Sequence, residues 1–506
     1  MKWPAVIFFT AVLIRFLYFP NDIYFGFDQA RDAFVAKQIL NGHLKIAGPP
    51  TTFEGLNHGG LFYYLYAPFY LIGKGDPAFT AAFLRVVNAL GVFLIFVLAK
   101  ILFNKYVGII AALLFAASFE QTQFALYFSN PSFAAISVLI MFLGLAILLF
   151  SKKDYGLIIA LAGLGLSIQF ELLLVYLILP FSLIILIFRK SMPKLSSTIK
   201  LLAATTLFLT LFTFIISEIK FGFRSFHYVL QLLFNGFGNS LFNKSSLYLF
   251  EMGQIVKFNL TGLTELKLAV ALTLFISFLI LLRSDSRKQM IFLSIWFFSA
   301  AMIYILGGNV DLKTTDVIQY QHNVGVSLSL ITFVSYLFYI LWKRNIFLPL
   351  ILLMLIIAAN LALIEKYNPL GSMAEFNSQS FMLLSDEKKV LDYIYQDAKG
   401  KNFAVKGITL PFYINTTWSY LFEWYGLKKY GYLPVWNGIN AAGYPGNLKV
   451  EDAQDKAPDQ RYLIIEPTRG IPGYLISDYL REESYFSDIK KETEIGKFKI
   501  QVRYKK

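Results

Sequence analysis

The chain has 506 residues, of which 57% are hydrophobic and 15% are charged, and its formal net charge is +14. A soluble domain cannot bury so large an apolar fraction, so the composition excludes a soluble enzyme and predicts an integral membrane protein. Because the sequence contains no cysteine, it also excludes disulfide bonds, zinc–thiolate sites and cysteine nucleophiles.

Eleven apolar segments are candidates for membrane-spanning helices, each of which needs about 20 apolar residues. They are residues 3–19, 78–103, 107–124, 131–150, 155–170, 172–188, 199–219, 266–282, 290–306, 324–342 and 346–364. We expect the first to be an uncleaved helix rather than a signal peptide, because Arg15 interrupts it and no small-x-small motif follows. Residues 61–73 are apolar but short, and they predict a re-entrant or interfacial helix on the outer side.

The distribution of Lys and Arg predicts the orientation of these helices. If the N-terminus lies in the cytoplasm, every inner segment is basic, as the positive-inside rule requires. The inner basic residues are Lys2, Lys100, Lys105, Lys152, Lys153, Arg189, Lys190, Lys194, Lys200, Arg283, Arg287, Lys288, Lys343 and Arg344. By contrast, the outer loop 118–130 has no basic residue and the loop 307–321 has only Lys313. The basic residues therefore anchor loops, which removes nucleic acid as a partner.

An odd number of spans places the C-terminus outside, on the same face as the long segments 20–60 and 220–265. We therefore divide the chain into a transmembrane region, residues 1–364 with a first outer loop at 20–77, and an extracytoplasmic domain, residues 365–506. In this domain, helix-like stretches at 386–398 and 418–429 and strand-like stretches at 403–409, 462–465 and 497–504 indicate a small α/β fold. A protein with its bulk outside the bilayer on one face is expected to work at that face.

The first outer loop carries the most informative residues. Asp28, Arg31 and Asp32 are spaced i, i+3 and i+4, so one face of a helix presents all three. A carboxylate near the membrane surface can act as a general base, and a guanidinium beside it can hold a phosphate. The alternative is that Asp28 caps the helix and Arg31 only pairs with its neighbours.

Further polar residues lie at the predicted outer ends of the spans. The candidates are Glu54, Asn57, His58, Glu120, Gln121, Gln123, Asn130, Gln169, Glu171, Asp311, Asp316, Gln319, Tyr320, Gln321 and His322. Ionisable groups at membrane depth are costly, and a shared depth predicts that they line one cavity. The alternative is that each is an ordinary turn residue at the interface. No spacing among the acidic residues and histidines matches a defined metal site, so no cofactor is expected, and a divalent metal is an alternative that the spacing does not support.

Four short motifs, taken in chain order, resemble the GT-C superfamily of membrane glycosyltransferases. They are Phe27-Asp28-x-x-Arg31, His58-Gly59-x-Leu61-x-Tyr63-Tyr64, Phe83-Leu84-Arg85 and Asn130-Pro131. The sequence is most similar to the family 39 branch, which includes protein O-mannosyltransferases and lipid A aminoarabinose transferases. The resemblance covers roughly residues 1–188 and the later spans in outline, and it implies an α-helical polytopic fold of the GT-C type.

The resemblance also implies a reaction on the outer face of the membrane. A sugar passes from a polyprenyl-phosphate donor to an acceptor hydroxyl or amine on a protein, lipid or glycan, usually with inversion. Asp28 would be the general base, and Arg31, His58 and Arg85 would bind the donor phosphate. Asp32, Asn57, Glu120, Asn130, Glu171, Tyr320 and His322 would contact the substrates. The sequence departs from the family at Gln29, Asn130 and Gln319-Tyr320, where charged residues are frequent.

The alternative function is a transporter or lipid flippase. Polar residues would then run through the depth of the membrane, and inverted repeats or broken helices would be expected. In this sequence the polar residues collect at one predicted face. A membrane-anchored binding protein would not need so many spans.

Overall fold

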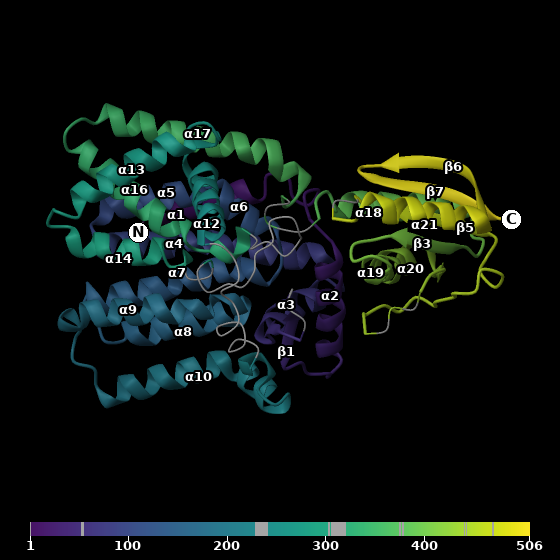
Figure 1. Cartoon of the computed structure of the whole chain (residues 1–506), viewed down its shortest axis with the longest axis horizontal. Helices are drawn as coiled ribbons and strands as arrows, with labels where there is room; N and C mark the ends of the chain where they lie inside the picture. Colours follow the sequence, from purple (N-terminus) through teal and green to yellow (C-terminus); the bar gives the residue numbers. More distant parts are fainter. Residues whose placement is uncertain are drawn as a thin grey trace.

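The computed structural model describes residues 2–51, 55–227, 241–301, 304, 320–373, 376, 379–439, 441, 443–467 and 470–506. A large helical bundle occupies one end of the molecule, and a small α/β domain formed by the C-terminal part of the chain occupies the other (Figure 1). The N-terminus lies in the bundle, on the side away from this domain. A mostly helical protein with a small C-terminal sheet region is therefore confirmed.

The bundle contains a helix within each of the eleven predicted segments. Its elements are α1 (Lys2–Arg15), α4 (Pro77–Leu102), α5 (Lys105–Ala117), α6 (Phe119–Leu126), α7 (Asn130–Leu149), α8 (Gly156–Phe170), η1 (Leu172–Leu177), α9 (Ile178–Phe188), η2 (Arg189–Ser191), α10 (Ser197–Lys220), α12 (Leu241–Val256), η3 (Lys257–Thr261), α13 (Lys267–Leu281), α14 (Arg287–Phe297), η4 (Tyr320–Asn323), α16 (Ser327–Trp342), α17 (Phe347–Tyr367) and η5 (Asn368–Leu370).

Among the described residues, five helical segments are long and apolar enough to cross a bilayer. They are Pro77–Leu102, Asn130–Leu149, Leu172–Ser191, Ser197–Lys220 and Phe347–Leu370. The count rises to six if α5 and α6, which meet at a 52° bend, form one span. The chain is thus a membrane protein, but the figure of eleven spans stays a prediction.

The bend between α5 and α6 interrupts the predicted span at 107–124. Ser118 leaves the helical conformation with ψ 123°, and its Oγ accepts a hydrogen bond from the N–H of Gln121 at 3.2 Å. Ser118 therefore caps α6 and ends α5 at the same point. All eight residues of α6 are buried, so this short helix points into the bundle rather than continuing across it.

Helix α7 forms the centre of the bundle, since 94% of its most apolar 18-residue stretch is buried. It packs closely on α8 because glycines remove side chains from the contact: a Cβ on Gly144 would lie 2.2 Å from the backbone of Ala160, and one on Gly163 would lie 2.2 Å from that of Met141. By contrast, only 6% of the most apolar stretch of α10 is buried, so this helix presents an apolar surface that suits lipid.

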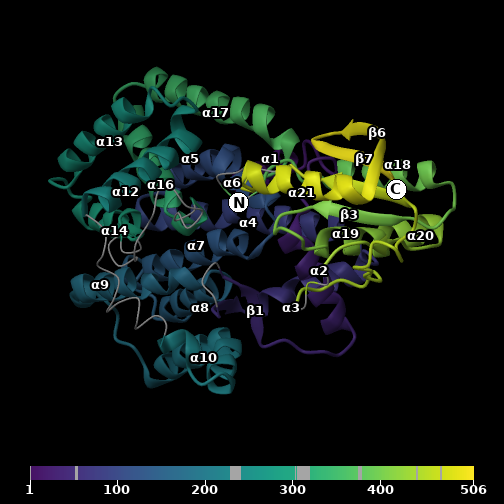
Figure 2. The ribbon, with the colours of Figure 1, turned by 45° about the vertical axis from the view of Figure 1, so that its right-hand side comes forward.

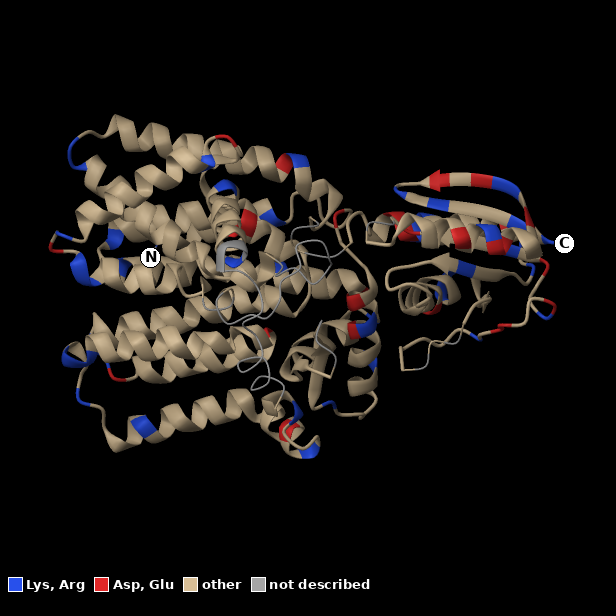
Figure 3. Cartoon of the chain, viewed as in Figure 1, with Lys and Arg blue, Asp and Glu red and all other residues tan. Residues whose placement is uncertain are grey.

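The first outer loop covers the end of the bundle that faces the C-terminal domain. It contains α2 (Phe27–Leu40), the short hairpin β1 (Ala47–Pro50) and β2 (Asn57–Gly59), and α3 (Leu61–Ile72). Helix α2 runs across the ends of the bundle helices (Figure 1). Lys and Arg gather at the loops of the opposite end (Figure 3), which agrees with the charge asymmetry on which the orientation rests. The orientation itself stays a prediction.

The C-terminal domain is built on a five-stranded sheet with the order β4-β3-β5-β7-β6. Strand β3 (Ala404–Ile408) runs parallel to β4 (Val435–Trp436) and β5 (Gln460–Ile465), whereas β7 (Phe498–Lys505) is antiparallel to β5 and β6 (Ser487–Ile495). Its helical elements are α18 (Leu384–Ala398), α19 (Thr416–Leu421), η6 (Phe422–Gly426), α20 (Leu427–Tyr430) and α21 (Gly473–Phe486). The predicted division at 364/365 falls near the end of α17 and stays a prediction.

The C-terminal domain docks on the first outer loop (Figure 2). The Tyr420 hydroxyl on α19 donates to the carbonyl of Gly75 at 2.6 Å, and the Tyr420 ring contacts that of Phe34 on α2. The backbone of Met382 accepts from Phe25 at 2.8 Å. This contact brings residues from both ends of the sequence around one cavity.

Candidate active site

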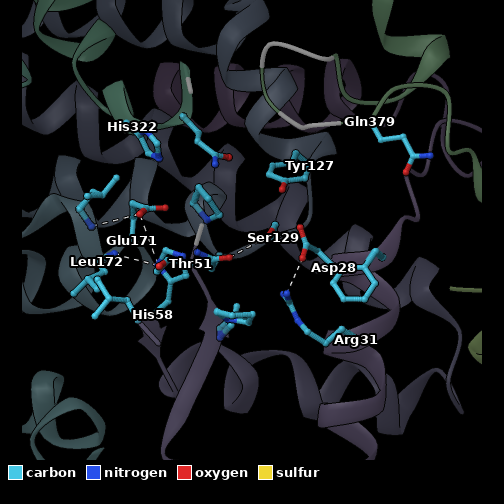
Figure 4. Close-up of a pocket in the computed structure, with 18 of the residues that line it drawn as sticks. Asp28, Arg31, Thr51, His58, Tyr127, Ser129, Glu171, Leu172, His322 and Gln379 are labelled. Atoms are coloured by element: carbon cyan, nitrogen blue, oxygen red, sulfur yellow. Dashed lines mark hydrogen bonds and ion pairs between the residues drawn. The ribbon is translucent and has the colours of Figure 1, made fainter. Parts of the chain in front are cut away.

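A cavity of about 500 Å³ lies where the bundle, the first outer loop and the C-terminal domain meet. Its polar and charged lining includes Asp28, Arg31, Thr51, His58, Ser129, Asn130, Glu171, Gln321, His322 and Gln379 (Figure 4). Apolar walls come from β1, from η1 and from the C-terminal loops, through Pro49, Pro50, Leu172, Leu173, Val175, Leu410 and Pro411. Seven of the residues predicted from sequence therefore share one cavity: Asp28, Arg31, His58, Asn130, Glu171, Gln321 and His322.

The first turn of α2 presents Asp28 and Arg31 to this cavity. The Arg31 Nη1 donates to Asp28 Oδ1 at 2.7 Å, while its Nε and Nη2 donate to Asp32 Oδ1 at 2.9 and 2.8 Å. The Asp28 side chain is 41% exposed, whereas that of Asp32 is 1% exposed. Asp28 is thus the carboxylate that a substrate can reach, and Asp32 fixes the guanidinium from behind.

Arg31 retains a donor for an anion after these contacts. A guanidinium has five N–H groups, of which the bonds to Asp28 and Asp32 use three and the Tyr63 hydroxyl engages a further one. Burial alone would lower the pKa of Arg31, but Asp32 and Asp28 outweigh burial and raise it, so the group stays charged. Burial raises the pKa of Asp32 to about 7, against the opposing effect of Arg31.

His58 and Glu171 form a second polar pair in the cavity. The His58 Nδ1 accepts the backbone N–H of Leu172 at 3.1 Å and lies 3.7 Å from Glu171 Oε1. Burial, with Arg31 and His322 adding to it, lowers the pKa of His58 to about 3, and burial raises the pKa of Glu171 to about 8. Both groups are therefore mainly neutral at pH 7, so this contact is not an ion pair. His58 then offers an uncharged Nε2–H as a donor.

Asn130 is held at the start of α7 by its neighbours. Its Nδ2 donates to the carbonyl of Phe170 at 2.7 Å, and its Oδ1 accepts from Ser129 Oγ at 3.1 Å. His322 reaches the cavity from η4, and burial lowers its pKa to about 4. The two histidines of the cavity are thus neutral at pH 7, as are its amide side chains, so Arg31 supplies the positive charge among its described lining residues.

Arg85 lies outside the cavity, contrary to its predicted role in binding the donor phosphate. Its guanidinium is fully buried and donates to both carboxylate oxygens of Asp22, at 2.8 and 3.1 Å, and to the carbonyl of Arg15 at 2.7 Å. These bonds tie α4 to the segment after α1. The sequence could not separate this role from phosphate binding, because either role needs an arginine near the outer end of a span.

Four other predicted substrate contacts are not among the residues that line the cavity. Glu120 is fully buried and bonds Asn259 and Ser327, and Tyr320 is buried near it. Asn57 lines a separate cavity of about 110 Å³. Asp32 contacts the cavity only through Arg31. Glu54, Asp311, Asp316 and Gln319 lie outside the described residues.

The C-terminal domain contributes cavity residues that the sequence did not indicate. Gln379 follows the last helix of the bundle, Leu410 and Pro411 follow β3, and Gly470 precedes α21. They lie 200 or more residues from the motifs, and no spacing or motif signals their position. Within the described ranges, no group of three or more His, Asp or Glu side chains is arranged to hold a metal ion.

Residues 57–216 match the family of dolichyl-phosphate-mannose-protein mannosyltransferases. The resemblance inferred from the motifs is thereby confirmed over that segment. A search of curated protein sequences finds no match.

The mannosyltransferase match includes His58, Asn130 and Glu171, but it begins after α2 and so excludes Asp28 and Arg31. Among solved structures, the oligosaccharyltransferase of Archaeoglobus fulgidus with Zn and sulfate is 14% identical, with a TM-score of 0.45 over 83% of this chain and 61% of that chain. The same archaeal protein, AglB, with an inhibitory peptide and a dolichol-phosphate is 12% identical, with a TM-score of 0.45 over 84% and 63%. The chain thus spans about three fifths of the length of these solved structures.

Proposed function

We propose that this protein is a membrane glycosyltransferase that moves a sugar from a polyprenyl-phosphate donor, of the dolichyl-phosphate class, to an acceptor on the outer face of the membrane. The observation that carries the proposal is the Asp28–Arg31 pair at the wall of the 500 Å³ cavity, with Asp28 half-exposed and Arg31 fixed by buried Asp32. The match to mannosyltransferases over residues 57–216 supports the same class of reaction.

In this mechanism Asp28 is the general base. It takes the proton of an acceptor hydroxyl or amine as that group attacks the anomeric carbon of the sugar, and the bond from that carbon to the lipid phosphate oxygen breaks. The attack occurs on the face opposite the phosphate, so the configuration of the sugar inverts. A carboxylate that is accessible and paired with only one N–H of Arg31 has lone pairs left for this proton.

Arg31 and His58 assist the departing phosphate. An N–H group of Arg31 that its side-chain contacts leave available can donate to it, and the positive charge is retained while negative charge develops on the leaving oxygen. His58 adds a neutral Nε2–H donor, because its Nδ1 is occupied by Leu172. Leu172, Leu173 and Val175 of η1 give the cavity an apolar wall that suits the first isoprene units.

The proposal is tested with purified protein in liposomes that contain polyprenyl-phosphate donors labelled in the sugar, starting with dolichyl-phosphate-mannose. Release of lipid phosphate and transfer of label to peptide, glycolipid and glycoside acceptors are measured for the wild type and for Asp28→Asn. We expect transfer by the wild type and its loss in the variant. Passage of intact labelled lipid across the bilayer, without transfer, would favour the flippase alternative.

A further inference from the structure

Gln379 is the polar side chain that the C-terminal part of the chain adds to the described lining of the cavity. Its Nε2 donates to Glu466 Oε2 at 3.0 Å and to the carbonyl of Pro467 at 3.1 Å. Both partners are acceptors, so the NH₂ group of the amide must face them. In Figure 4 the amide nitrogen points away from His58 and Glu171.

The orientation of this amide leaves Oε1 for the cavity. No donor from the described part of the chain reaches Gln379 Oε1, and the side chain as a whole is 2% exposed. An amide oxygen accepts hydrogen bonds and cannot donate them. The cavity therefore presents a fixed acceptor on the side of Asp28, at a site where a substrate group would have to supply an O–H or N–H.

Glu466 holds this arrangement in place. Besides Gln379, its carboxylate accepts the backbone N–H of Leu410 at 2.9 Å and the indole N–H of Trp418 at 2.9 Å. Leu410 lies in the cavity wall, and buried Trp418 belongs to α19, which packs on α2. One buried carboxylate thus joins the amide, the cavity wall and the helix that contacts the Asp28-bearing helix.

We infer that Gln379 is a specificity-determining residue that accepts a hydrogen bond from an O–H or N–H of the acceptor substrate, and that Glu466 is a positioning residue that sets the direction of its amide. This inference rests on the proposed glycosyl transfer. It assigns the C-terminal domain to the acceptor side of the cavity, whereas the apolar η1 wall and Arg31 face the donor. The acceptor must then carry a donor group close to its nucleophile, as a peptide N–H or a neighbouring sugar hydroxyl does.

The test compares Gln379→Ala with Gln460→Ala. Gln460 is a matched control because it is a buried glutamine of the same domain, does not line the cavity, and also donates twice through Nε2, to Asp397 and Tyr462. With labelled dolichyl-phosphate-mannose and peptide or glycoside acceptors, Gln379→Ala should raise the KM for the acceptor about tenfold, as expected for one lost hydrogen bond. The KM for the donor should stay within about twofold, and Glu466→Gln should shift the acceptor KM in the same direction. An unchanged acceptor KM, or an equal rise in Gln460→Ala, overturns the inference.

A thiol measurement separates this inference from the proposed reaction. Because the natural chain has no cysteine, Gln379→Cys introduces a single thiol. Both positions are buried, at 2% and 0% exposure for Gln379 and Asn437, but Gln379 lines the cavity and Asn437 does not. A small methanethiosulfonate reagent that enters the cavity should therefore modify Gln379→Cys faster than Asn437→Cys. Equal rates would overturn the inference whether or not the protein transfers sugar. Failure of the proposed reaction instead appears as an absence of transfer by the wild type.

Discussion

Replacement of Asp28 by asparagine should abolish transfer without unfolding the protein. The Asp28 side chain is 41% exposed, and Arg31 keeps both bonds to Asp32 when the charge at 28 is removed. The pair is exposed only on the Asp28 side, and Arg31 keeps its second partner, so we expect its loss to lower the free energy of unfolding by about 1 kcal/mol. For a chain of this size, we expect the midpoint of thermal unfolding to fall by less than about 2 °C.

Catalysis should respond differently from stability. Loss of a general base typically lowers kcat by about 10²–10⁴-fold. Binding of the donor should be unchanged or tighter, because removal of one negative charge leaves Arg31 with a larger net positive field for the phosphate. The assay is transfer of label from dolichyl-phosphate-mannose in liposomes, together with donor binding measured on the same preparation.

The chain offers a close control for this variant. Asp478 and Arg481 on α21 form another i, i+3 ion pair at 2.8 Å, in the C-terminal domain and away from the cavity lining. Asp478→Asn should leave both kcat and donor binding unchanged. The assignment of Asp28 would be refuted if Asp28→Asn retained kcat within tenfold of the wild type, or if its loss of turnover were matched by an equal loss of donor binding.

Three further predictions concern contacts that hold the site in place. Arg85→Met should lower the free energy of unfolding by about 3–5 kcal/mol, because it leaves Asp22 buried and unpaired. The double variant with Asp22→Leu should recover much of this loss, measured as the midpoint of thermal unfolding. Tyr420→Phe should lower the free energy of unfolding by about 1 kcal/mol and speed proteolysis of the C-terminal domain, since it removes the hydrogen bond to the carbonyl of Gly75. Burial raises the pKa of Glu466 to about 7, so the folded state binds an extra proton, and the domain should lose stability as pH rises from about 4.5 to 7. Glu466→Gln should flatten that pH dependence of the unfolding midpoint.

The sequence determined the class of the protein and most of its helices. Runs of apolar residues are local features of the sequence. In a bilayer such a run is stable only if its backbone hydrogen bonds are satisfied internally, as in a helix, and every predicted segment contains one. The spacing of Asp28 and Arg31 likewise predicted that they lie on one helix face, where they form an ion pair, because an α-helix brings residues three apart together. The bond between the adjacent residues Arg31 and Asp32 does not follow from that spacing. The small sheet-containing tail was also visible in its polar, alternating segments.

Tertiary structure decided which polar residues meet. Arg85 and Glu120 lie at the same predicted depth as His58 and Glu171, yet packing turns the first two into buried partners of Asp22 and Asn259, outside the cavity. The break at Ser118 depends on a cap that a hydropathy pattern does not contain.

The cavity residues of the C-terminal domain could not be predicted from the sequence for a related reason. Gln379 and Leu410 reach the cavity only because β3, β5 and α19 fold together and dock on α2. Their positions depend on contacts between segments hundreds of residues apart, and no local spacing encodes such a contact. A local pattern fixes which groups a helix presents, whereas the free energy of packing fixes which of those groups share a cavity.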